Sequence, residues 1–109
     1  MHRKTKSPLE ELGECKGKLD DRLYEDIRGD LSRLDYEHHS EIFPARVYYN
    51  PLRGNFSKVR KFLGYIGAHR NRKWQQKERY FRVDLDVRQI LILARSSLVR
   101  KIKKAKKER

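Results

Sequence analysis

The sequence predicts a small single α+β domain with three to four helices, a short antiparallel sheet and a basic helical extension at the C-terminus. Three observations support this. The 109 residues suit one domain with one core. Two segments have helical apolar spacing, and residues 79–86 alternate apolar and charged side chains. We expect the α+β domain over 19–98, between an N-terminal arm with a short helix at 1–18 and a basic tail at 99–109.

Two helices are expected before residue 40. The stretch SPLEEL begins the first, because Ser7 can cap a helix, Pro8 suits its first position and Glu10 completes a capping box. The second is expected from about Asp20 to His38, because it carries one apolar stripe at helical spacing. The residues of that stripe are Leu19, Leu23, Ile27, Leu31 and Leu34.

The centre of the chain predicts a strand and then a helix. Residues 45–49 have strand preference, and turn signals follow them. A helix is expected over 55–66, with Asn55 as its cap and Gly67 as its stop. Residues 68–78 are expected to form a loop or a frayed helix.

The last third contains the clearest strand pattern and the least certain segment. In RYFRVDLDV, Phe81, Val83 and Leu85 alternate with charged residues, which predicts a strand with one apolar face. Residues 88–94 fit either a strand or a helix. Apolar residues recur at helical spacing from Val87 to Ala105, and this favours one long C-terminal helix capped near Asp86.

The charge is unevenly distributed. The chain has a formal net charge of +13, and residues 1–42 carry 8 basic and 11 acidic side chains against 20 and 4 in residues 43–109. Excess positive charge repels itself in an isolated domain and is favourable beside a phosphate backbone. Nucleic acid is therefore the leading class of partner, and an anionic membrane surface is the second. No run approaches the roughly 18 apolar residues of a membrane span, so none is expected.

Three basic segments are expected to contact phosphates: the helix at 55–66, the stretch around 70–79 and the C-terminal run RKIKKAKKER. Trp74 or Tyr80 can stack on a base, whereas the alternative for Trp74 is packing in the core. The candidate nucleic-acid-binding residues are Arg53, Lys58, Arg60, Lys61, Arg70, Arg72, Lys73, Trp74, Lys77, Arg79, Arg100, Lys101, Lys103, Lys104, Lys106 and Lys107.

The sequence does not predict an enzyme. His38 and His39, beside Glu37 and Glu41, are best read as a polar patch at a helix end, since adjacent histidines do not share a helix face. Asp84 and Asp86 are best read as an ion-pair partner and a helix cap. The single cysteine excludes an internal disulfide. No phosphate-binding glycine loop or nucleophile signature is found, so we expect no cofactor, no metal and no small-molecule substrate.

One local resemblance implies a phosphoinositide as an alternative ligand. The stretch GYIGAHRNRKWQQKERYFRVD resembles the first two strands of a pleckstrin-homology domain, through residues 64–66, Trp74 and residues 79–81. The resemblance covers about 20 residues, and the 28 that follow Phe81 are too few for the remaining strands of such a domain.

These observations predict a structural RNA-binding component of a ribonucleoprotein particle, most simply a ribosomal protein that neutralises rRNA phosphates. The acidic helix at 19–36 is expected to contact neighbouring proteins. The expected location is intracellular, in a ribosome of the cytoplasm or of an organelle such as the mitochondrion, with the nucleus as the alternative. A DNA-binding regulator and a peripheral phosphoinositide or anionic-membrane binder are the alternative functions.

Overall fold

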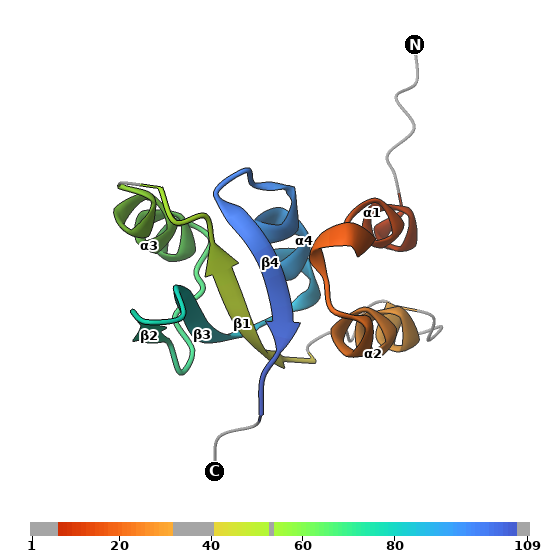
Figure 1. The fold of residues 1–109 in the computed structure, drawn as a ribbon. Coiled ribbons are helices and arrows are strands. Elements are labelled where there is room, and N and C mark those ends of the chain that lie inside the picture. The colour runs from red at the N-terminus through yellow and green to blue at the C-terminus, as the bar shows by residue number, and fades with distance from the viewer. Residues whose placement is uncertain (1–6, 32–40, 53, 107–109) are drawn as a thin grey trace.

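The computed structural model describes residues 7–31, 41–52 and 54–106. It shows a small α+β domain built on a four-stranded antiparallel sheet, which confirms the predicted fold class (Figure 1). The elements in chain order are α1 (Pro8–Glu14), the 3-10 turn η1 (Lys16–Lys18), α2 (Asp21–Leu31), β1 (Phe43–Tyr49), α3 (Asn55–Tyr65), β2 (Lys73–Gln75), β3 (Tyr80–Leu85), α4 (Val87–Arg95) and β4 (Val99–Lys104).

From β1 onward the chain follows a β-α-β-β-α-β path. The strands lie in the order β2-β3-β1-β4, and each neighbouring pair is antiparallel. This is the split βαβ arrangement of ferredoxin-like sheets. Alternate strand residues and the apolar sides of all four helices form one buried cluster on one side of the sheet, and α1 and α2 lie beyond its β4 edge (Figure 1). In Figure 1, α4 lies behind β4.

Two of the predicted N-caps, Ser7 and Asp86, are confirmed. The Ser7 side chain accepts from the Glu10 backbone N–H, and Asp86 and Gln89 form a reciprocal capping box at the start of α4. Helix α3 ends in a Schellman motif with Gly67 at φ 77°, a conformation that suits glycine. Its N-cap is Gly54 at φ 85°, not the predicted Asn55.

The predicted C-terminal helix is wrong beyond residue 95. Helix α4 ends at Arg95, and residues 99–104 form strand β4 beside β1, not a basic helical extension. The Ser96 hydroxyl accepts from the Leu98 N–H, a local turn bond that competes with helix. A register shift at Tyr48/Tyr49 then brings Val99 and Ile102, three residues apart, onto the same buried side. This spacing imitates a helix.

Other expectations differ in smaller ways. The predicted loop at 68–78 contains the short edge strand β2, which pairs with β3. Residues 64–66, which the pleckstrin-homology resemblance implies to be a strand, end helix α3. The predicted second helix is present as α2 over its described part, and its expected continuation over 32–38 lies outside the described residues.

Asp20 joins the N-terminal helices to the edge of the sheet. One of its carboxylate oxygens caps α2 by accepting from the Leu23 N–H at 2.7 Å, and the other accepts from the Lys104 N–H at 2.7 Å. Its own N–H donates to the Ile102 carbonyl at 3.1 Å, beside an isolated parallel bridge between Leu19 and Ile102. These bonds occupy the outer edge of β4, which would otherwise present unpaired backbone groups.

We expect Asp20→Ala to lower the free energy of unfolding by about 1–2 kcal/mol, because it removes a helix cap and an acceptor at the strand edge. Asp21→Ala is the matched control, since Asp21 is exposed in the first turn of the same helix and should change stability by less than about 0.5 kcal/mol. Urea unfolding measures both. Equal losses in the two variants would contradict a role for Asp20 at the sheet edge.

Candidate nucleic-acid interface

The sheet face opposite the helical layer is polar and aromatic, and we call it the open face. It is formed by the strand residues that alternate with those of the hydrophobic core, as the strand register shows. Its members are Arg46, Tyr48, Lys73, Gln75, Tyr80, Arg82, Asp84, Arg100, Lys101 and Lys103. Asp84 is the acidic residue among them.

Two tyrosines occupy the middle of the open face. Tyr48 on β1 lies directly opposite Tyr80 on β3, with ring centroids 5.0 Å apart and planes tilted by 49°. Both residues are only 8% exposed, although the described helices pack on the other side. Other side chains of the strands must therefore shield the two rings from solvent.

These shielding side chains are cationic. The Arg46 guanidinium lies 5.1 Å from the centre of the Tyr80 ring, and Arg100 and Lys103 lie 5.8 and 5.1 Å from the centre of the Tyr48 ring. Arg100 and Lys103 are exposed to solvent. A side-chain hydrogen bond to Tyr48 raises the pKa of Arg46 above its ordinary value.

The strand register also places like charges directly opposite one another. Arg46 lies across from Arg82 on one side and from Lys103 on the other, and Lys73 lies across from Arg82. Directly opposed like charges destabilise a sheet. Asp84 compensates the charge of Arg82 within the protein.

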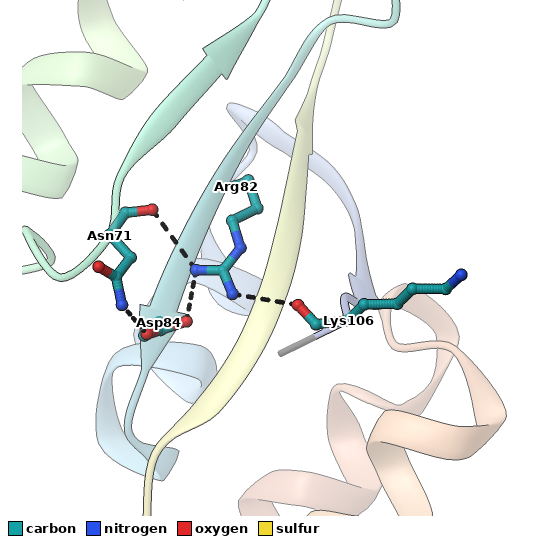
Figure 2. Close-up of polar contacts among 4 residues, drawn as sticks. All are labelled: Asn71, Arg82, Asp84 and Lys106. Carbon is teal, nitrogen blue, oxygen red and sulfur yellow. Dashed lines mark hydrogen bonds and ion pairs between the residues drawn. The ribbon is translucent and has the colours of Figure 1, made fainter. Parts of the chain in front are cut away.

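Arg82 anchors the open face through several polar contacts (Figure 2). It is 8% exposed, and its guanidinium pairs with the Asp84 carboxylate at 2.5 Å. It also donates to the backbone carbonyls of Asn71, at 3.4 Å, and Lys106, at 3.1 Å. The Asn71 amide donates to the second Asp84 oxygen at 2.6 Å. Arg82 thus ties the loop before β2 and the segment after β4 to the central strand.

The structure gathers part of the predicted set on this face. Lys73, Arg100, Lys101 and Lys103 belong to the open face. Lys104 points to the opposite side, where its ammonium pairs with Asp26 of α2 at 2.7 Å.

The remaining candidates are spread over other parts of the surface. Lys58, Arg60 and Lys61 are exposed on α3, in the helical layer. Arg70 and Arg72 lie in the loop before β2, Lys77 and Arg79 in the β2–β3 turn, and Lys106 just after β4. Arg53 and Lys107 lie outside the described residues.

Trp74 lies on the helical side of the edge strand. Its ring stacks on Phe56 with centroids 3.9 Å apart, and its indole N–H donates to the Tyr49 hydroxyl at 2.9 Å. Phe56 in turn stacks on Phe81. Trp74 therefore takes part in packing, which was the alternative weighed for it, and it remains 45% exposed.

Sequence reasoning left Arg46, Tyr48 and Tyr80 out of the candidate set. Tyr80 was named only as an alternative to Trp74 for stacking. The available signal was the alternation in FPARVYY, which puts Arg46 and Tyr48 on one face of a strand whose other face is apolar. The neighbour of that strand became known only from the sheet order.

The acidic candidates have structural partners. Asp86 caps α4 and Asp84 pairs with Arg82, as the simpler interpretation predicts. In the part of the chain that the structure describes, no three His, Cys, Asp or Glu side chains are grouped to hold a metal ion. His38, His39 and Glu37 lie outside that part.

Comparisons with models of protein families, with curated proteins and with solved structures found no match. Among the described helices, none is long and apolar enough to cross a membrane.

We expect Arg82→Met to lower the free energy of unfolding by about 3 kcal/mol, because it leaves the Asp84 carboxylate without its buried partner. Lys73→Met, an exposed residue directly across from Arg82, should change stability by less than about 0.5 kcal/mol. Thermal and urea unfolding measure both variants. A loss for Arg82→Met no larger than that for Lys73→Met would show that the guanidinium does not anchor this face.

Proposed function

We propose that this protein binds RNA as a structural component of a ribonucleoprotein particle, with a single-stranded stretch of RNA lying across the open face. The observation that carries the proposal is the Tyr48–Tyr80 pair on the two central strands, covered by cations instead of by a helix. Aromatic rings on a sheet offer stacking surfaces to unpaired bases.

The cations over the tyrosine rings can attract phosphates and can also uncover the rings for stacking. Phosphates passing over the face attract Arg46, Arg100 and Lys103, and movement of these side chains toward phosphates exposes the rings beneath. The RNA recognition motif also stacks bases on aromatic side chains of a four-stranded sheet. A shared sheet topology does not by itself imply a shared function, so the support comes from the side chains on the face.

The whole-chain charge supports a particle as the setting. Residues 43–109 carry 20 basic and 4 acidic side chains, far more charge than the open face uses. Further RNA around the domain would neutralise the cations of α3, the β2–β3 turn and the C-terminus. We propose a ribosomal particle, of the cytoplasm or an organelle, as this setting.

The acidic N-terminal half is the proposed contact with neighbouring proteins. The apolar stripe of α2 is buried in the protein's own core, so this contact must use the polar side of the helix. Asp21, Arg22 and Glu25 are exposed there. Charged groups on such a surface set partner choice and orientation more than affinity.

The test is a binding titration with fluorescently labelled single-stranded RNA at several salt concentrations. Tyr48→Leu should weaken binding by about 1–3 kcal/mol without changing the salt dependence, because it removes a stacking surface and no charge. The double variant Arg100→Gln/Lys103→Gln should weaken binding and lower the slope of log K against log salt by about 1.4, since each lost phosphate contact contributes about 0.7.

Two matched variants and two other ligands control the experiment. Tyr48→Phe keeps the ring and should bind normally. Lys58→Gln/Lys61→Gln removes the same charge from α3 and should affect RNA binding less than the open-face pair does. Circular dichroism checks that each variant folds. Equal effects of the two double variants would refute the open face as the site, and equal affinity for duplex DNA or anionic vesicles would refute RNA as the ligand.

A further inference from the structure

A hollow of about 380 Å³ lies at one edge of the open face, between β2 and the segment that follows β4. We call it the edge hollow. The residues that line it are Arg46, Lys73, Trp74, Gln75, Tyr80, Arg82, Ala105 and Lys106. Its lining comes from strands β1, β2 and β3 and from two residues after β4, and the register of the three strands fixes their side chains relative to one another.

The electrostatics of the edge hollow favour an anion. Its described lining includes four basic residues and no acidic one. Asp84 pairs with the Arg82 guanidinium and neutralises its charge. The Lys106 carbonyl faces Arg82, and its side chain extends away from it (Figure 2). Arg46 and Lys73 also line the hollow, and both add positive charge to it.

Arg46 also has unused hydrogen-bonding capacity. Its guanidinium is held over the Tyr80 ring, and its Nε–H is buried without a hydrogen-bond partner among the described residues. A buried donor without an acceptor is costly, and an anionic oxygen relieves that cost. The Gln75 side chain adds an amide at the same edge.

We propose that the edge hollow binds the phosphate group of a nucleotide, held between the Arg46 guanidinium and the Lys73 ammonium. A guanidinium and a phosphate form short, charge-assisted hydrogen bonds, and a lysine adds a point charge. The inference deepens the proposed RNA binding and rests on it for the source of the phosphate. A terminal phosphate monoester and an internal phosphodiester offer the same anionic oxygens.

Trp74 lines the edge hollow, but its ring stacks on Phe56 on the helical side of the sheet, so the test does not depend on its fluorescence. We would titrate the full-length protein with uridine 5′-monophosphate and with uridine, and follow binding by isothermal titration calorimetry. The monophosphate should bind about tenfold more tightly than uridine, because only it has the anionic oxygens. Arg46→Gln and Lys73→Gln should each remove most of that preference.

Lys106→Gln is the matched control. It removes one positive charge from the same wall, but its side chain extends away from the Arg82 guanidinium, so the preference should persist. Circular dichroism checks that all three variants fold. Equal signals from uridine and its monophosphate, or equal losses in Lys73→Gln and Lys106→Gln, would overturn the proposal.

A second arm separates the two sources of phosphate. The same short RNA is compared with a 5′-phosphate and with a 5′-hydroxyl. Tighter binding of the phosphorylated RNA, abolished by Lys73→Gln, assigns the hollow to a chain end. Equal binding of both RNAs, weakened by Lys73→Gln, assigns it to an internal phosphate. Binding of the monophosphate without binding of any oligonucleotide would support a phosphate site in the edge hollow and refute the proposed RNA binding. The two proposals can therefore fail separately.

Discussion

The position of β1 between β3 and β4 is the constraint on which the rest of the structure depends. Both ladders fix its register, and a slip of one residue would move every side chain of β1 to the other face of the sheet. Ala45 and Val47 are fully buried against the helices, so no such slip is compatible with the core. The same register places Arg46 and Tyr48 on the open face. Burial on one side thus determines the chemistry of the other.

The arrangement of charges on the open face destabilises the isolated domain. Arg46 lies between Arg82 and Lys103, and directly opposed like charges weaken a sheet. The cations find partial compensation over the tyrosine rings and, for Arg82, in Asp84. Phosphates would compensate the others more fully. A surface that is unfavourable alone and favourable beside a polyanion is consistent with a protein that works within an RNA particle.

Features of the fold that depend on neighbouring residues were predictable from the sequence. Features that depend on pairing between distant segments were not. The caps at Ser7 and Asp86 and the alternation of β3 depend on neighbouring residues and could be read directly. Strand β4 could not be read in this way, because the bulge opposite Tyr48 gives Val99 and Ile102 a helical spacing. The candidate site had the same difficulty. Charge density identified Arg100 and Lys103, but only the sheet order brings them over Tyr48.

The measurement that tests the central claim most directly is sedimentation of a lysate from the native host on a sucrose gradient, with and without RNase, followed by detection of this chain. The account predicts that the protein travels with a large particle and moves to lighter fractions after RNase treatment. The RNA that travels with it would then identify the particle. A protein that stays at the top of both gradients as a free small chain would contradict the account.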